Sequence, residues 1–380
     1  MGKEALHIFQ VCCSQSWGGM EMVAVQLANK LKSEGMRISF LAAQGSMSES
    51  MLRNFPITLL TKSSHGYIDP RRIKMVHQWI QKEDVDLVHT HFSKDLWFLV
   101  PALSGNNTHV PLVLTKHVGT MKSKKDLLHR FIYRRVDAVV SISKLIQWNV
   151  IQTHPVQADK VKYIPNGVDL DVYDGHKTGR EQIRRSFSIP SDALVVGIVG
   201  RLQWWKGYRE FIQMAERLIR TRSDVWFLAV GGATVGEEKE AEDIQNYARS
   251  LHLNGRFIFS GFQKDVKPFL AAMDLFVYPA YAEAFGLVLV EAMAMALPVV
   301  STHCDGVPEI VVDGETGKLV LPRNTEVLTT AVVELLNSPH KMKALGRAGR
   351  IRAVNVFNWH RIVSETLLLY HHLIEKRRTL

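Results

Sequence analysis

Two segments of the sequence begin in the same way, and this duplication constrains the fold more than any other feature. Apolar residues 6–13 precede a loop with two glycines and a helical pattern over 21–31. Apolar residues 194–199 precede Gly200 and a helical pattern from about 208 to 220. A strand, a glycine turn and a helix form the opening unit of a doubly wound nucleotide-binding sheet. The sequence therefore predicts two such domains.

Each segment continues with short apolar strands that alternate with amphipathic helices, which is typical of parallel sheets with crossover helices. The expected strands span 37–42, 85–89, 112–115, 138–142, 226–230, 256–259, 275–278 and 298–301. The predicted fold class is α/β, with two Rossmann-like domains whose parallel sheets face a central cleft. The charged stretch 174–191 is the expected linker, and the final segment, 356–380, is expected to form a helix that packs back on the N-terminal domain.

The composition is that of a soluble globular protein, with 46% apolar and 22% charged residues. A net charge of +10 suits partners that carry phosphate, such as nucleotides, nucleic acid or anionic lipid. Cys12, Cys13 and Cys304 have no metal-ligand spacing, and we expect them to be reduced core thiols of a cytoplasmic protein. The longest apolar stretch, 284–300, contains a glutamate and a proline, which argues against a membrane span.

The most informative motif is E-A-F-G-L-V-L-V-E, which places Glu283 and Glu291 on either side of a glycine turn. The backbone N–H groups of Phe285, Gly286 and Leu287 are expected at a helix N-terminus, where free donors and the helix dipole attract phosphate. Glu291 lies in an otherwise apolar helix, where a carboxylate without a partner is costly. We therefore interpret Glu291 as a ribose ligand and Glu283 as a ligand of sugar hydroxyls.

Two further glycine turns follow predicted strands. Arg201 and Lys206 lie in the G-R-L-Q-W-W-K-G turn, and both can reach a pyrophosphate and stabilise charge on a leaving diphosphate. Gly18 and Gly19 allow the backbone to approach a ligand closely, although an ordinary tight turn explains them equally well.

Histidines follow two predicted strands of the first domain. His117 comes after strand 112–115 and can contact a donor sugar or an acceptor hydroxyl. His89 and His91 share one face of an extended chain, with a cleft-lining or structural role favoured over a metal site.

With these motifs in order, the sequence resembles the family 4 glycosyltransferases, which are retaining enzymes of the GT-B fold. The E-A-F-G-L-V-L-V-E block resembles the E-x₇-E signature of that family, and the resemblance extends over nearly the whole chain. Other typical segments are I-P-N-G-V-D (164–169), G-R-L…K-G (200–207), A-L-P-V-V (296–300), G-V-P-E (306–309) and D-G-E-T-G (313–317).

The resemblance implies an acceptor-binding domain over 1–183 and a nucleotide-sugar domain over 184–355. It assigns the diphosphate to Arg201 and Lys206, the ribose to Glu291 and the donor sugar to Glu283. His117 matches a family histidine near the reacting sugar.

The resemblance also matches Gly18 and Gly19 to the loop over the phosphates, and it gives residues 306–309 a part in shaping the donor site. It implies no metal requirement and front-face transfer with retained anomeric configuration, in preference to double displacement through Glu283. UDP-sugars are the first expectation for the donor and GDP-sugars the second. The expected role is cell-envelope polysaccharide or lipopolysaccharide synthesis.

Between Lys116 and Arg135 there are seven Lys or Arg residues and one acid, Asp126. Residues 126–135 form a basic amphipathic pattern that suits either an anionic membrane surface or packing in the core with solvated charges. We expect a glycan or lipid-linked acceptor, reached in the cytoplasm or at the inner face of the cytoplasmic membrane.

A sugar-nucleotide epimerase and a non-enzymatic nucleotide-sugar sensor are the alternatives with the same architecture. Nucleic-acid binding is disfavoured because no aromatic stacking platform accompanies the charge. A nicotinamide dehydrogenase is disfavoured because neither glycine turn is G-x-G-x-x-G.

Overall fold

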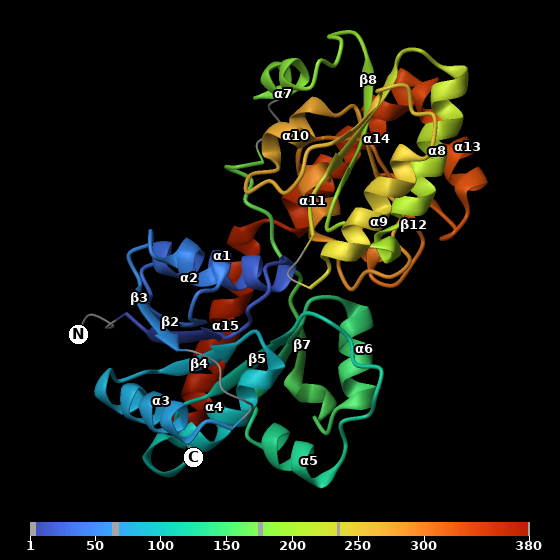
Figure 1. Cartoon of the computed structure of the whole chain (residues 1–380). Helices are drawn as coiled ribbons and strands as arrows, with labels where there is room; N and C mark the ends of the chain where they lie inside the picture. The colour runs from blue at the N-terminus through green and yellow to red at the C-terminus, as the bar shows by residue number, and fades with distance from the viewer. Residues whose placement is uncertain (1–4, 63–67, 174–177, 234–235, 379–380) are drawn as a thin grey trace. The chain divides into compact units, whose positions relative to one another are not determined.

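The computed structural model describes residues 5–62, 68–173, 178–233 and 236–378 of the chain. Its contacts divide into two compact units (Figure 1). Unit 1 comprises Met1–Asn166 and Trp359–Leu380, and unit 2 comprises Gly167–Asn358. Residues 167–173 and 178–183, which the resemblance places at the end of the acceptor domain, cluster with unit 2, and the roles of the two domains stay a prediction.

Unit 1 contains a seven-stranded sheet in the order β3-β2-β1-β4-β5-β6-β7, and every pairing in it is parallel. Its strands are β1 His7–Cys12, β2 Arg37–Ala43, β3 Thr58–Lys62, β4 Leu87–Thr90, β5 Leu112–Lys116, β6 Ala138–Ser141 and β7 Val161–Tyr163. Its helices are α1 Gly19–Ser33, α2 Met47–Leu52, α3 Pro70–Lys82, α4 Leu96–Ala102, α5 Leu127–Arg134, α6 Lys144–Thr153 and α15 Trp359–Arg378.

Unit 2 contains a six-stranded parallel sheet in the order β10-β9-β8-β11-β12-β13. Its strands are β8 Leu194–Val199, β9 Val225–Val230, β10 Phe257–Phe259, β11 Leu275–Tyr278, β12 Val299–Thr302 and β13 Lys318–Val320. Its helices are α7 Arg180–Ser186, α8 Tyr208–Thr221, α9 Glu238–Arg249, α10 Lys267–Ala272, α11 Leu287–Ala294, α12 Val307–Ile310, α13 Thr325–Leu336 and α14 Pro339–Val356.

The predicted α/β class with two Rossmann-like parallel sheets is confirmed. Strands such as β1 and β4 are buried along their whole length, as expected for runs of apolar residues covered on both faces. The strand order reverses direction between β1 and β4 in unit 1 and between β8 and β11 in unit 2. Ligands of open α/β sheets bind outside the carboxyl ends of the strands at such a switch point.

The predicted linker over 174–191 is wrong for its second half, where helix α7 is part of unit 2. Arg184 on α7 is buried, and its guanidinium donates to Asp274 at 2.7 Å and to the Ala193 carbonyl at 2.9 Å. Arg180 reaches the other oxygen of the same carboxylate at 2.8 Å. The charged residues that suggest a solvated linker thus include two arginines that bind Asp274 and hold α7 against α10.

The last helix, α15 (red in Figure 1), completes the core of unit 1 and packs against α1. Tyr370 of this helix is fully buried, and its hydroxyl contacts His89 on β4 and Gln10 on β1. Within the described ranges, no helix has the length and apolar character needed to span a bilayer.

Candidate functional site

The carboxyl ends of β8 and β11 lie side by side in unit 2, and the tight turn after β8 depends on glycine. A Cβ atom on Gly231, the first residue after β9, would lie 1.8 Å from the Gly200 carbonyl oxygen. The same carbonyl accepts a hydrogen bond of 2.8 Å from the Tyr208 hydroxyl. The turn that carries Arg201 and Lys206 is thus fixed at the strand end.

Lys206, Tyr278 and Glu283 form a closed polar triangle at this edge of the sheet. The Lys206 Nζ lies 2.7 Å from Glu283 Oε2 and 2.6 Å from the Tyr278 hydroxyl, which in turn donates to Glu283 Oε2 at 2.6 Å. Gly207 has a φ of 81°, and a Cβ there would lie 2.0 Å from the Pro279 carbonyl oxygen. Only glycine allows the turn to approach β11 closely enough for Lys206 to reach this carboxylate.

The triangle holds Glu283 as a carboxylate. Burial alone would raise its pKa, but the Lys206 ammonium and hydrogen bonds from Lys206, Tyr278 and the Phe285 N–H outweigh burial and lower the pKa below its usual value. Burial raises the pKa of Tyr278 well above its ordinary value. The site therefore presents an ion pair and a neutral phenol at neutral pH.

The loop after β11 brings the start of α11 next to the triangle. The Gly306 N–H donates to the Glu283 carbonyl at 2.9 Å, and the Glu283 N–H donates to Asp305 at 3.0 Å. Gly286 has a φ of 91° and precedes α11 without a side-chain cap. Because the first N–H groups of a helix have no intrahelical partner, the Leu287 end of α11 can receive an anion. The Phe285 N–H is instead directed at Glu283.

Glu291 is buried on α11, and its partner is the Tyr173 hydroxyl. Burial raises the pKa of Glu291 to about 7, although the Tyr173 hydrogen bond opposes the shift. Arg201 lies further out, with 40% of its side chain exposed and a guanidinium nitrogen 3.5 Å from Glu237. The predicted residues of unit 2 thus lie in the turn after β8, in the loop after β11 and on α11.

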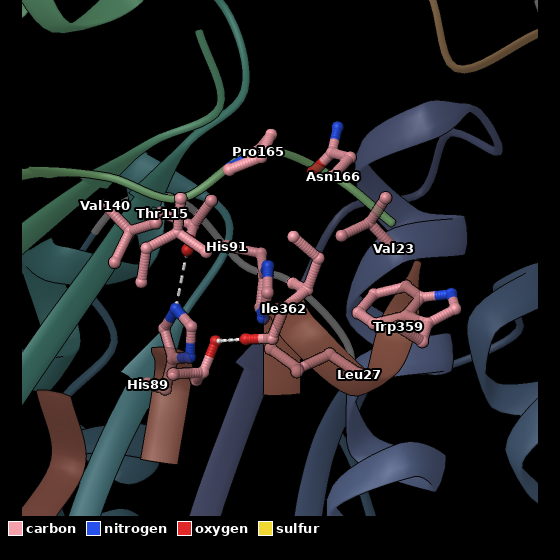
Figure 2. A pocket seen from close by; sticks show the side chains of 12 residues that line it. Val23, Leu27, His89, His91, Thr115, Val140, Pro165, Asn166, Trp359 and Ile362 are labelled. Atoms are coloured by element: carbon pink, nitrogen blue, oxygen red, sulfur yellow. Dashed lines mark hydrogen bonds between the residues drawn. The ribbon is translucent and has the colours of Figure 1, made fainter. Parts of the chain in front are cut away.

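The other predicted residues belong to unit 1. Gly18 and Gly19 begin α1, and His117 is buried directly after β5, where its Nε2 lies 3.1 Å from Nδ1 of His91. A small cavity beside this cluster is lined by His89, His91 and Thr115, together with Asn166 and Trp359 (Figure 2). In the ranges that the structure describes, no group of His, Cys, Asp or Glu side chains is arranged to hold a metal ion.

Three side chains of the site do not emerge from the sequence reasoning: Tyr278, Tyr173 and Asp305. Tyr278 is the last residue of a predicted strand, and position at the carboxyl end of that strand is the signal that could have found it. Tyr173 lies more than a hundred positions before Glu291 in the sequence, and no local pattern links the two residues.

Two family models match the chain in succession. The model described as "Glycosyltransferase Family 4" matches residues 17–172, and the model described as "Glycosyl transferases group 1" matches residues 179–352.

Several relatives and solved structures align over between 76% and 97% of this chain. The chain is 24% identical to N-acetyl-alpha-D-glucosaminyl L-malate synthase of Bacillus anthracis, over 96% of both proteins. It is 28% identical to alpha-maltose-1-phosphate synthase of Mycolicibacterium smegmatis, over 76% of this chain and 79% of that protein. A glycosyltransferase from Rickettsia africae superposes with a TM-score of 0.87, with 21% identity, 97% of this chain and 99% of that one covered. The structure of Anabaena HepE in complex with UDP and glucose superposes with a TM-score of 0.83 and 23% identity, over 95% of this chain and 98% of that one.

Lys206→Met tests the ion pair of the triangle. The variant leaves the Glu283 carboxylate buried without its cation, so we expect the free energy of unfolding to fall by about 3 kcal/mol at pH 7. Urea denaturation measures this loss. Adding Glu283→Gln should recover most of it, because a neutral amide needs no cation. Arg220→Met, which breaks the more exposed pair with Glu216, should cost no more than about 0.5 kcal/mol. Equal losses at both sites would contradict the assignment.

Glu291 gives the stability a pH dependence of defined sign. Between pH 4.5 and about 7, the Glu291 carboxyl keeps its proton in the folded protein, whereas the same carboxyl in the unfolded chain has already released it. The contribution of this proton to the free energy of unfolding is therefore complete below pH 4.5 and is lost as the pH rises to about 7.

Urea denaturation between pH 4.5 and 8 of the wild type and Glu291→Gln measures this dependence. The stability of the wild type relative to the variant should fall by about 1 kcal/mol per pH unit up to pH 7 and then level off. Glu315→Gln, at an exposed glutamate of the same unit, should follow the wild type. Parallel curves for the wild type and Glu291→Gln would count against the raised pKa.

Proposed function

This chain belongs to the family 4 glycosyltransferases and has the GT-B fold, and we propose that it is a retaining enzyme that uses a nucleotide-sugar, with UDP-sugars as first choice. We further propose that unit 2 binds the donor and unit 1 the acceptor, a glycan or lipid-linked glycan of cell-envelope polysaccharide or lipopolysaccharide synthesis. The observation that carries the proposal is the Lys206–Tyr278–Glu283 triangle beside the free N-terminus of α11.

The geometry of unit 2 supports specific roles in donor binding. Lys206 and Arg201 supply cations, and α11 supplies backbone donors, for a diphosphate. The Glu283 carboxylate can accept hydrogen bonds from sugar hydroxyls, because Lys206 and Tyr278 both contact its Oε2 oxygen and leave the Oε1 oxygen for the ligand. Glu291 accepts hydrogen bonds from the ribose, where ribose hydroxyls replace or join that of Tyr173.

The proposed reaction is a front-face substitution at the anomeric carbon. The acceptor hydroxyl oxygen forms the new glycosidic bond as the bond from the anomeric carbon to the diphosphate oxygen breaks, and both lie on the same face of the sugar. The proton of the hydroxyl passes to the departing diphosphate, whose charge Lys206 and Arg201 stabilise. His117 is the proposed hydrogen-bond partner of a hydroxyl of the donor sugar or of the acceptor. Two solved structures of similar fold are the lipopolysaccharide outer core galactosyltransferase WaaB and WaaG, a glycosyltransferase involved in lipopolysaccharide biosynthesis. Their activities support the choice of acceptor class.

Incubation of the purified protein with a panel of UDP- and GDP-sugars and a membrane extract tests the function. NMR of donor loss and product anomer is expected to give transfer from one donor with retained configuration. An epimerised sugar nucleotide would indicate an epimerase, and binding without conversion would indicate a sensor.

The two glutamates should separate turnover from binding. Glu283→Gln is expected to lower kcat at least 100-fold with little change in nucleotide affinity, because the amide loses the charge that faces the transferred sugar. Glu291→Gln is expected to weaken nucleotide binding about tenfold with a smaller effect on kcat. Steady-state kinetics and calorimetric titration with UDP measure the two effects. The opposite pattern would reverse the assignment.

We propose that helix α5 and the loop before it contact an anionic membrane. The predicted apolar face of this helix consists of Leu127, Leu128, Phe131 and Ile132. Ile132 packs in the core, with 4% of its surface exposed, whereas Leu127, Leu128 and Phe131 are exposed at 84%, 57% and 66%. Met121 is fully exposed as well. Basic residues surround these apolar side chains in the sequence, namely Lys122, Lys124, Lys125, Arg130 and Arg134. An apolar face with a basic rim fits an anionic lipid surface.

Vesicle sedimentation tests the membrane proposal with lipids that contain phosphatidylglycerol or only phosphatidylcholine. Changing Leu127 and Phe131 to serine, or Lys122, Lys124 and Lys125 to glutamate, should weaken binding to the anionic vesicles at least tenfold. Leu368→Ser, at an exposed leucine of α15, is the matched control and should bind normally. Normal vesicle binding and transfer to lipid acceptor in both variants would refute the proposal.

A further inference from the structure

The core of unit 1 contains a cluster of buried polar side chains, and His117 is the only member to which the proposed reaction gives a role. It draws on strands β1, β4 and β5, on the residues directly after β4 and β5, and on the last helix. We call it the histidine cluster, and its members are Gln10, His89, His91, Thr115, His117 and Tyr370, all buried. Figure 2 shows His89 bonded to Thr115 beside the cavity, with His91 next to it.

The histidine cluster forms one continuous path that ends at His117. The Tyr370 hydroxyl lies 2.5 Å from His89 Nδ1 and 3.3 Å from Gln10 Nε2. Gln10 Oε1 lies 3.0 Å from His91 Nε2, and His91 Nδ1 lies 3.1 Å from His117 Nε2. The rings of His89 and His91 stack with centroids 4.4 Å apart.

The three imidazoles are neutral at physiological pH. Burial lowers the pKa of His91 to about 3. Burial, followed by the charges of the neighbouring histidines, lowers the pKa of His89 well below its ordinary value. The pKa of His117 is likewise well below its ordinary value, through burial, His91 and Lys116. A neutral imidazole has one donor and one acceptor nitrogen, and its hydrogen-bond partners decide which is which.

The donors along the path can be followed from Tyr370. Gln10 Nε2 donates to the Tyr370 oxygen, and His89 Nδ1 is the acceptor at hand for the buried Tyr370 proton, in which case His89 Nε2 donates to Thr115. The other end of the Gln10 amide is an acceptor, so the proton of His91 lies on Nε2. His91 Nδ1 is then an acceptor, and His117 must donate from Nε2. The remaining nitrogen of His117, Nδ1, has its lone pair free, and no group in the described ranges bonds to it.

We propose that Gln10, His91 and Tyr370 are positioning residues that fix His117 as the Nε2–H tautomer, so that its Nδ1 accepts a hydrogen bond from a sugar or acceptor hydroxyl. The inference deepens the proposed function and rests on it for the identity of the hydroxyl. The tautomer itself does not depend on any transfer reaction.

The orientation of the Gln10 amide is the step that decides the tautomer. If the amide were turned over, every donor in the path would reverse, and His117 would present an N–H at Nδ1 instead of a lone pair. In the orientation that the structure has, the Tyr370 hydroxyl gives Gln10 Nε2 its acceptor and His91 Nε2 gives Gln10 Oε1 its donor. Tyr370→Phe removes that hydroxyl while keeping the ring, and Gln10→Met removes the amide while keeping an unbranched side chain of similar size.

Nitrogen-15 NMR of histidine-labelled protein, without any ligand, tests the proposal. The His117 resonances are assigned by their loss in His117→Gln. In the wild type we expect a protonated Nε2 and an unprotonated Nδ1. In Tyr370→Phe and Gln10→Met we expect both nitrogens to shift toward the averaged values of mixed tautomers. Thr366→Val is the matched control, because it removes a buried hydroxyl one turn away on the same helix that bonds only to the Ile362 carbonyl.

Kinetics then separate the positioning role from the function itself. Tyr370→Phe is expected to lower kcat about tenfold, because the hydrogen bond from the substrate hydroxyl to His117 Nδ1 is weakened, and to leave the KM for the nucleotide-sugar unchanged. Thr366→Val should leave both constants and the spectrum unchanged. A wild-type His117 protonated on Nδ1, or identical His117 spectra in both network variants and the wild type, would overturn the proposal. The expected tautomer in a protein without transferase activity would uphold the network and refute the proposed function.

Discussion

Parallel pairing is the constraint on which the rest of this structure depends. In a parallel sheet all strands end at the same edge, so every residue that follows a strand is delivered to one side of the unit. In unit 2 this brings the turn after β8 against the loop after β11, and Lys206 meets Glu283 there. In unit 1 it aligns His91 and His117, which follow neighbouring strands. The chemistry of both units is a consequence of sheet direction.

Burial and the hydrogen-bond partners together determine the pKa of each carboxyl group in the site. Glu283 and Glu291 lie eight positions apart, yet their pKa values move in opposite directions. The difference is the partner: Glu283 has an ammonium, a phenol and a backbone N–H, whereas Glu291 has a single tyrosine hydroxyl. The same surroundings that desolvate a carboxylate also strengthen its interaction with a cation. One carboxyl is thereby held charged, and the other titrates near neutrality.

The sequence was sufficient for features that depend on local pattern. Buried strands, glycine turns and the helix that begins after Gly286 each have a signature within about ten residues. Short edge strands such as β3, β7 and β13 lack one, because they are only partly buried and contain polar residues. Helix α7 was missed because a buried arginine looks, in sequence, like a solvated one.

Contacts between distant residues could not be predicted from the sequence at all. Gln10 and Tyr370 are 360 positions apart, and nothing near either residue indicates the other. Tyr173 and Glu291 pose the same difficulty on a smaller scale. These pairs follow from the three-dimensional order of strands and from the path of the last helix, which only the complete fold specifies.

The position of α15 has a consequence for biogenesis. Unit 1 is discontinuous, and the ribosome makes its final helix only after all of unit 2 has been synthesised. Until then β1 and β4 lack the helix that covers Gln10 and His89, and unit 1 exposes part of its core. Unit 2 is contiguous and can fold first, so the usual order of domain folding from the N-terminus is reversed. The first unit to be translated is the last to be finished.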